Sequence, residues 1–210
     1  GSRIDAEIPP SQAAYRSGRG TTEQLLTIKL LAEKAAVTPN YETSILLMDM
    51  SKAFDRVERR TVLEDLRAIL QEDELHLVKL LMEDVCLAVK IDGLTGKEFN
   101  TNIGVPQGDC LSRIFFTLYL AHALREEPKQ HPEDVENHPE LAPHLRDHCY
   151  TVVKRSGLLI PLQYADDICW LGMNCRHSLD NVKKKIPGML EQRNLMINNE
   201  KTEEYQIRRD

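Results

Sequence analysis

Apolar residues are spaced along the chain in two patterns, one typical of helices and one typical of strands. Five segments have helical spacing: one that begins at Thr21, then residues 61–70, 73–85, 110–124 and 178–193. Short apolar runs bounded by turn residues predict strands at 45–50, 87–91, 158–163 and 168–171, with strand-like pieces across 196–207. Helices that alternate with strands, some joined as hairpins, predict an α+β fold in which helices pack on one face of a sheet.

Three local signals refine these elements. Thr21 and Gln24 have the spacing of a capping box at the start of the first helix. Asp92-Gly93 is typical of a tight hairpin turn. Pro187 argues against an unbroken last helix, because proline lacks an amide hydrogen and obstructs the preceding turn.

The net charge at first argues against a nucleic-acid partner. The 210 residues carry a formal charge of −6, whereas a phosphate backbone attracts a basic surface. Residues 126–148 alone account for −5, with seven acids against two bases. Their four prolines and four histidines predict an exposed acidic loop, and their spacing matches no standard zinc motif. The remaining chain is close to neutral, so its charge does not exclude nucleic acid.

Other bulk properties exclude membrane and disordered proteins. Hydrophobic residues make up 41% of the chain, which is enough for a sizeable core. No apolar run reaches the roughly 18 residues of a membrane span, and no signal peptide is expected. The five cysteines are odd in number and never spaced C-x-x-C, which is typical of reduced thiols in an intracellular protein. The expected location is the nucleus or the cytoplasm.

Acidic residues stand at the ends of predicted strands, where a charge is costly. Asp49 ends the apolar run 45–48, and Asp166-Asp167 lies between two strand candidates. A carboxylate beside a core needs a counter-charge, and hard oxygen ligands suit Mg²⁺. Carboxylates facing one another from two strands could hold two ions roughly 4 Å apart. The alternative is that Asp166-Asp167 is an ordinary polar turn and Asp49 an ordinary strand end.

Several segments resemble reverse transcriptases. The best matches to motifs A, B and C are DMSKAFD at 49–55, GVPQGDCLS at 104–112 and YADD at 164–167. Residues 14–26 resemble the segment before motif A, and 198–202 resemble motif D. The Ser-Lys-Ala-Phe-Asp sequence within motif A resembles non-LTR (LINE-type) retrotransposon and group II intron enzymes more than retroviral ones.

The resemblance implies a catalytic centre. It identifies Asp49, Asp166 and Asp167 as metal ligands, joined by the backbone carbonyl of Met50, for two Mg²⁺ ions that Mn²⁺ can replace. It identifies Lys201 as a general acid for the pyrophosphate leaving group, although a solvated lysine is an equally good interpretation.

The resemblance also implies nucleotide and template contacts. Phe54 falls at the steric gate that rejects a ribose 2′-hydroxyl, with a core aromatic as its alternative. Gln107 and Gly108 would contact the incoming nucleotide. Arg16 and Arg19 would touch template phosphate, unless they belong to an ordinary basic loop.

One departure from the family pattern is Arg113, which stands where the family often has proline. We expect it to alter the start of the helix at 110–124 without touching the chemistry.

The implied fold is the palm of a right-hand polymerase, an antiparallel sheet with helices on one face, plus part of the fingers. Residues 1–44 would be partial fingers with a lead-in helix and 45–210 the palm, with the loop at 126–148 and no thumb. The expected function is an RNA-directed DNA polymerase of a retroelement that adds dNTPs to a DNA primer on an RNA template. These 210 residues alone would be weakly active or inactive.

Two alternatives remain open at this point. One is a catalytically silent palm that binds nucleic acid or protein. The other is an RNA polymerase of related fold. The oligomeric state is not predicted.

Overall fold

The computed structural model describes residues 2–37, 42–125, 151–153, 157–173 and 176–208. The acidic loop expected at 126–148 lies outside these residues. Within them, a five-stranded sheet has the order β6-β7-β8-β1-β9, and every neighbouring pair is antiparallel. Its strands are β1 (Glu42–Met50), β6 (Thr151–Val153), β7 (Gly157–Tyr164), β8 (Asp167–Met173) and β9 (Ile197–Arg208).

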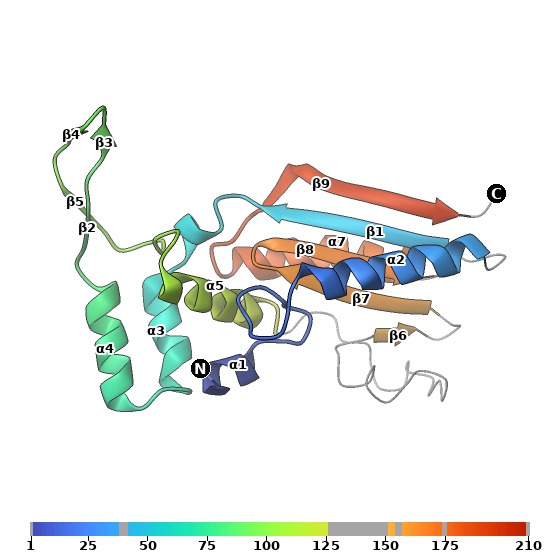
Figure 1. Cartoon of the computed structure of the whole chain (residues 1–210), viewed down its shortest axis with the longest axis horizontal. Helices are drawn as coiled ribbons and strands as arrows, with labels where there is room; N and C mark the ends of the chain where they lie inside the picture. Colours follow the sequence, from blue (N-terminus) through green and yellow to red (C-terminus); the bar gives the residue numbers. More distant parts are fainter. Residues whose placement is uncertain (1, 38–41, 126–150, 154–156, 174–175, 209–210) are drawn as a thin grey trace.

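The helices and a projecting arm surround this sheet (Figure 1). The helical segments are α1 (Ser2–Glu7), α2 (Thr21–Val37), η1 (Phe54–Arg56), α3 (Arg59–Arg67), α4 (Glu72–Met82), α5 (Cys110–Ala123) and α7 (Arg176–Glu191). The arm consists of short strands: β2 (Val85–Leu87), β3 (Lys90–Ile91), β4 (Leu94–Thr95) and β5 (Phe99–Thr101). The predicted α+β fold with an antiparallel sheet is therefore confirmed.

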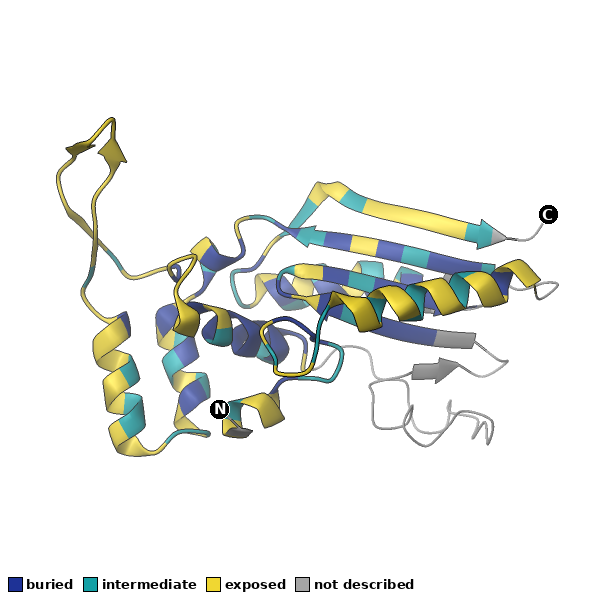
Figure 2. Ribbon diagram, in the orientation of Figure 1, coloured by how far each residue is buried: buried dark blue, intermediate teal, exposed yellow. Residues whose placement is uncertain are grey.

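The hydrophobic core lies between one face of the sheet and the helices α3, α5 and α7. Side chains alternate along a strand, so Leu46, Met48 and Met50 of β1 point to the same face, where all three are buried. Phe116 and Leu120 of α5 belong to the same cluster and are fully buried. Figure 2 shows buried residues along the sheet and on α3 and α5, whereas the arm is exposed from Cys86 to Asn100.

The lead-in helix α2 packs on the opposite face, so helices cover both faces of the sheet rather than one. It contacts β1 and β9 and crosses in front of the sheet in Figure 1. At its far end Ala35 is buried, as are Thr43 of β1 and Met173 of β8 on the same face. Toward the other end of β1 the cover stops, and Leu47 and Asp49 remain partly accessible to solvent.

Helix α7 continues through Pro187, contrary to the interruption expected from the sequence. An internal proline costs about 3 kcal/mol. The apolar stripe of this helix, Leu179, Val182, Ile186 and Leu190, is almost completely buried. Each such side chain contributes about 1.5–3 kcal/mol on burial, so packing outweighs the local cost.

Two other elements follow or extend the predictions. The predicted turn is present: Asp92 and Gly93, with φ of 48° and 82°, join β3 to β4. The strand-like pieces predicted at the end of the chain are one strand, β9, whose pairing with β1 is interrupted once.

Candidate active site

The hairpin between β7 and β8 places two carboxylates at one end of the sheet. Tyr164 pairs with Asp167, which leaves Ala165 and Asp166 as the two residues of the turn. Ala165 has a φ of 55°, in the left-handed region that costs a non-glycine residue energy. Although it is at the tip of a turn, Ala165 is buried. The turn therefore needs support from elsewhere in the chain.

That support comes from the segment 11–14, which lies along the hairpin. The Gln12 side chain accepts a hydrogen bond from the Ala165 amide at 3.0 Å and donates one to the Ala165 carbonyl at 3.2 Å. Gln12 is 1% exposed. The Ala13 amide also donates to the Gln163 carbonyl, and the Gln163 amide donates to the Ser11 carbonyl, both at 2.9 Å. These contacts fix both backbone groups of the turn residue before Asp166.

Gln24 strengthens the same junction from α2. Its amide nitrogen donates to the Ser11 carbonyl at 3.2 Å and to the Gln163 carbonyl at 2.7 Å. The capping-box role suggested by its spacing from Thr21 is thus replaced by a contact to β7.

The third carboxylate, Asp49, lies on the neighbouring strand. The ladder between β1 and β8 ends at Met48 opposite Ile168, one residue from Asp49 and one from Asp167. Both acids line a cavity of about 560 Å³. Lys201 lines the same cavity, and its Nζ lies 3.3 Å from Asp49 Oδ2.

An irregularity in β9 explains how Lys201 reaches Asp49. The pairing of β9 with β1 jumps from Glu203 opposite Leu47 to Asn198 opposite Asp49, so residues 199–202 bulge out of the ladder. Asn198 closes the bulge: its Oδ1 accepts from the Glu200 amide, and its carbonyl accepts from the Thr202 hydroxyl. The segment expected to be motif D is therefore a bulge that aims a lysine at the carboxylates.

Burial and the neighbouring acids together shift the pKa of Asp167. Burial raises its pKa above the ordinary value, and the nearby charges of Asp166 and Asp49 raise it further, against an opposing effect of Lys201. Two carboxylates close enough to raise the pKa of a third create a negative potential that favours cation binding. Their oxygens are hard donors, which suits Mg²⁺.

The three carboxylates do not form a ready-made ligand set. Asp49 and Asp167 line one cavity, whereas Asp166 lines the next. Among the residues that the structure describes, no three histidine, cysteine or acidic side chains are grouped closely enough to hold a metal ion. The donors thus fit a divalent ion in chemical type, while one oxygen of Asp49 faces Lys201.

The cavity beside Asp166 is about 440 Å³ in volume and brings together the residues expected to contact a nucleotide. Its lining consists of Tyr15, Phe54, Gln107, Gly108, Arg113 and Asp166. Phe54 is 8% exposed, and its ring stacks on Phe116 of the core, with centroids 4.4 Å apart. Phe54 therefore packs into the core and also borders the cavity. Its environment is compatible both with a core aromatic and with a steric gate.

The turn before α5 is held closely against η1. The Val105 amide donates to the Phe54 carbonyl at 2.9 Å, and the Gly104 amide donates to the Val57 carbonyl at 2.8 Å. Gly104 has a φ of +79°, and a Cβ there would lie 3.0 Å from the Asp55 carbonyl oxygen. Only glycine fits this close approach. Asp109 then caps α5 by accepting from the Leu111 and Ser112 amides.

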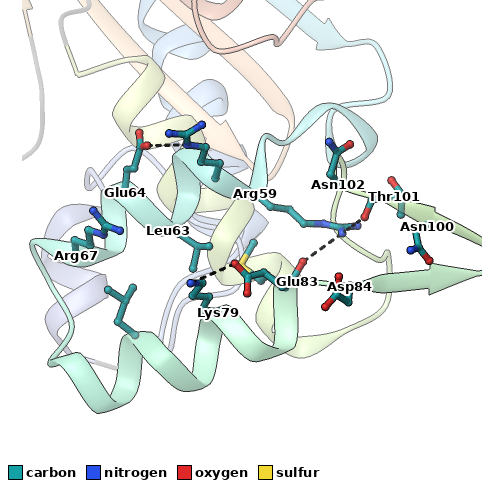
Figure 3. A pocket seen from close by; sticks show the side chains of 13 residues that line it. Arg59, Leu63, Glu64, Arg67, Lys79, Glu83, Asp84, Asn100, Thr101 and Asn102 are labelled. Carbon is teal, nitrogen blue, oxygen red and sulfur yellow. Dashed lines mark hydrogen bonds and ion pairs between the residues drawn. The ribbon is translucent and has the colours of Figure 1, made fainter.

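A buried arginine that the sequence analysis did not identify stabilises this turn by hydrogen bonds to its carbonyls. Arg59 is 6% exposed and donates to the carbonyls of Gly104, Thr101, Met82 and Ile103 at 2.6–3.3 Å. Figure 3 shows it extending from α3 between the end of α4 and β5, at the edge of a cavity of about 830 Å³.

That cavity does not include the carboxylates of the candidate site. Two of its charged pairs, Arg60 with Glu64 and Lys79 with Glu83, neutralise each other. We therefore regard Arg59 as a structural support for the turn and assign no ligand to the cavity.

The two arginines expected to contact template are engaged within the protein. Arg16 forms an ion pair with Asp5 at 2.6 Å and donates to the Pro9 and Gln12 carbonyls, which leaves its side chain about 10% exposed. Arg19 donates to the Pro10 carbonyl at 3.0 Å. This geometry favours the alternative for Arg16, that it shapes its own loop. Arg19 stays a prediction.

An antiparallel sheet that carries acids on two adjacent strands, beside a cavity bordered by a glycine turn, is the arrangement expected for the palm of a nucleic-acid polymerase. The chain belongs to the family described as "Reverse transcriptase (RNA-dependent DNA polymerase)", whose profile matches residues 2–208. Polymerases of this family generally depend on a divalent metal.

Curated relatives are retroelement polymerases. The chain is 31% identical over 118 residues to the "RNA-directed DNA polymerase from mobile element jockey" of Drosophila funebris, which covers 56% of this chain and 13% of the relative. It is 31% identical over 111 residues to the "Probable RNA-directed DNA polymerase from transposon X-element" of Drosophila melanogaster, covering 53% and 12%. The matches thus span about an eighth of those relatives' length.

Solved structures with this fold include telomerases. Apo telomerase from Candida tropicalis, truncated from its C-terminal domain, matches with a TM-score of 0.64 at 18% identity, covering 98% of this chain and 39% of that one. Telomerase from Candida albicans in complex with a telomeric RNA fragment matches with a TM-score of 0.59 at 13% identity, covering 98% and 32%. At these identities the likeness establishes the fold. No helix in the described part of the chain is long and apolar enough to cross a membrane.

Proposed function

We propose that these residues form the catalytic palm of an RNA-directed DNA polymerase of a non-LTR retroelement. The observation that carries the proposal is the meeting of Asp49 and Asp167 at one cavity, with Asp166 bordering the next together with Phe54 and Gln107. Family membership and the jockey and X-element relatives support it. The substrates are a dNTP, an RNA template and a DNA primer.

The carboxylates would hold the metal. Asp49, Asp166 and Asp167, with the carbonyl of Met50 at the end of β1, are the oxygen donors for two Mg²⁺ ions, which Mn²⁺ can replace. Bound ions of this kind lower the pKa of the primer hydroxyl and neutralise charge on the leaving pyrophosphate. The hairpin contacts of Gln12 keep the carboxylates at the end of the sheet, and the Asp166 side chain faces the nucleotide cavity.

The cavity residues would select and position the nucleotide. Phe54 is held by its stack on Phe116, so its ring cannot easily move aside for a ribose 2′-hydroxyl. The turn that carries Gln107 and Gly108 is anchored through Val105, which gives it a fixed place beside the nucleotide. Lys201 is the proton donor for pyrophosphate, and before the substrate binds it neutralises Asp49.

Substitution of the carboxylates tests the proposal. We expect the native polypeptide that carries these residues to extend a DNA primer on an RNA template with Mg²⁺. Asp49→Asn and Asp167→Asn should each reduce extension at least about a thousandfold, because several kcal/mol of charge stabilisation are lost. Asp92→Asn is the matched control, since Asn-Gly suits the same hairpin turn. These 210 residues alone should show weak extension or none.

The same assay decides between the proposal and a silent palm. Extension that survives Asp49→Asn contradicts the metal mechanism. A native polypeptide that binds primer–template tightly but never extends it supports the binding module instead. Preference for NTPs over dNTPs supports an RNA polymerase.

A further inference from the structure

Arg113 borders the nucleotide cavity, contrary to the expectation that it affects only the start of α5. It lies in the first turns of α5, and it shares the cavity lining with Gln107, Gly108 and Asp166. It is the one cationic side chain among the residues that form this lining. The chain therefore places a positive charge beside the β7–β8 hairpin, at a position where the family often has an uncharged proline.

Among the residues that the structure describes, no carboxylate lies within 4.0 Å of the Arg113 guanidinium, although Asp166 lines the same cavity. Its guanidinium carbon instead lies 5.3 Å from the centroid of the Tyr15 ring. Such a contact over an aromatic face is worth about 0.5–1 kcal/mol at an exposed site. A guanidinium held by its face keeps the N–H groups at its edge free to bind an acceptor.

Tyr15 is itself held in place for this contact. Its backbone has a φ of 60°, a left-handed conformation that costs about 1–3 kcal/mol and persists only where the surroundings impose it. The surroundings here are the Gln12 junction: the Ala14 amide donates to Gln12 Oε1 at 3.0 Å, and the same oxygen accepts from Ala165. One glutamine thus ties the catalytic turn to the residue before Tyr15.

A cation at this position would offset the negative charge that phosphate groups bring to a site already rich in carboxylates. Nucleotides and nucleic-acid strands bring phosphate charge toward Asp49, Asp166 and Asp167. Lys201, which lines the neighbouring cavity, is paired with Asp49. Among the described residues that line the cavity beside Asp166, Arg113 is the cation available for phosphate, and a guanidinium fork matches phosphate geometry.

We propose that Arg113 binds a phosphate group in the nucleotide cavity, with Tyr15 as the ring that holds its guanidinium. This inference rests on the proposed polymerase function and adds a binding residue to it. The phosphate belongs either to the triphosphate of the incoming dNTP or to the backbone of the template strand. Both present the same chemistry to the guanidinium, and their contributions are separable by experiment.

The test compares Arg113→Ala, Arg113→Lys, Tyr15→Leu and Tyr15→Phe with wild-type native polypeptide. The matched control is Arg60→Ala, an exposed arginine of α3 that does not line the nucleotide cavity. Two quantities are measured: KM and kcat for dNTP in primer extension, and the salt dependence of primer–template affinity from fluorescence anisotropy. Arg113→Ala should weaken one of them about 10- to 100-fold, as expected for a lost charge-assisted hydrogen bond. Arg113→Lys and Tyr15→Leu should give smaller losses, and Tyr15→Phe almost none.

The pattern of losses identifies the phosphate. A raised KM for dNTP with unchanged duplex binding assigns Arg113 to the triphosphate. A weaker duplex whose salt slope falls by about one unit assigns it to the template backbone. If Arg113→Ala matches Arg60→Ala in both assays while Asp49→Asn still abolishes extension, the inference is overturned and the proposed function stands. If wild-type protein neither binds nor extends primer–template, both are overturned.

Discussion

Gln12 holds the backbone of Ala165 by both ends of its side-chain amide, through bonds of 3.0 and 3.2 Å that join residues 153 positions apart. The contact is buried on both sides. It replaces the hydrogen bonds that a tight, left-handed turn cannot make within its own hairpin. The position of the candidate catalytic carboxylates therefore depends on a residue near the start of the chain.

We predict that Gln12→Met loosens the catalytic hairpin. Methionine fills a similar volume but leaves the amide and carbonyl of Ala165 without partners, at a cost of about 1–3 kcal/mol for each buried group. Hydrogen exchange of the amides at 163–167 should accelerate far more than exchange in α5. Gln71→Met, a change at the exposed N-cap of α4, is the control. Equal protection of the hairpin in Gln12→Met and wild type would falsify this assignment.

Lys201 should compete with metal for Asp49. The pair is partly exposed, with 67% of the lysine side chain accessible, so it is worth only about 0.2–1 kcal/mol. We expect Lys201→Met to tighten Mn²⁺ binding about two- to fivefold in a titration followed by electron paramagnetic resonance. Primer extension should fall about a hundredfold, because the proposed proton donor is lost.

Lys183→Met provides the control for Lys201. Lys183 of α7 pairs with Glu204, which lies on β9 as Lys201 does but away from Asp49. This variant should leave both metal affinity and extension unchanged. Weaker Mn²⁺ binding in Lys201→Met would show that the lysine supports the ligand set instead of competing with it.

Phe54→Val should relax the choice of sugar. The smaller side chain removes the clash with a 2′-hydroxyl, so the ratio of NTP to dNTP incorporation should rise at least about tenfold. Stability should fall by about 2–3 kcal/mol, because the stack on Phe116 is lost from a buried site. Phe116→Leu disrupts the same stack without bordering the cavity, so it should loosen the Phe54 ring and raise the ratio less than Phe54→Val does. An unchanged ratio in Phe54→Val would refute the gate.

Local pattern was enough to predict the three central strands of the sheet, β1, β7 and β8, and the hairpin between β7 and β8, because a buried strand and a tight turn each leave a short-range signal. The runs at 45–50, 158–163 and 168–171 all fall within β1, β7 and β8. Pro187 misled for the opposite reason. Its local cost is visible in the sequence, whereas the packing that outweighs it depends on the whole core.

The residues that support the site could not be predicted, since polar contacts between distant segments have no period. Gln12 stands in a polar loop, and nothing nearby distinguishes it from a solvated glutamine. Arg59 begins a helix rich in charged residues, which is typical of an exposed helix. It is nevertheless buried, and its guanidinium donates to carbonyls of three later segments. Arg113 was visible as a departure from the family pattern, but its place beside Tyr15 follows only from the fold.

Asp65 should control stability in acid. It joins α3 to α5 and to the loop after α7, accepting hydrogen bonds from His122 at 2.8 Å and from Arg193 at 2.6 and 3.1 Å. Burial by itself raises the pKa of Asp65, but the bonds from His122 and Arg193 outweigh it and hold the pKa below its ordinary value of 3.8. A lowered carboxyl pKa stabilises the fold at every pH above the unfolded value, and this contribution is lost as the pH falls through the folded value. Asp65→Asn should therefore lower the free energy of unfolding by about 2 kcal/mol at pH 7. This loss is smaller than for a fully buried pair, because Arg193 keeps some contact with water.

Urea denaturation at several pH values measures this contribution. The gap in unfolding free energy between Asp65→Asn and wild type should stay constant from pH 7 to about 5 and shrink below about 4. The control Asp92→Asn should show no such gap, and a gap for Asp65→Asn that persists undiminished at pH 2 would contradict the assignment.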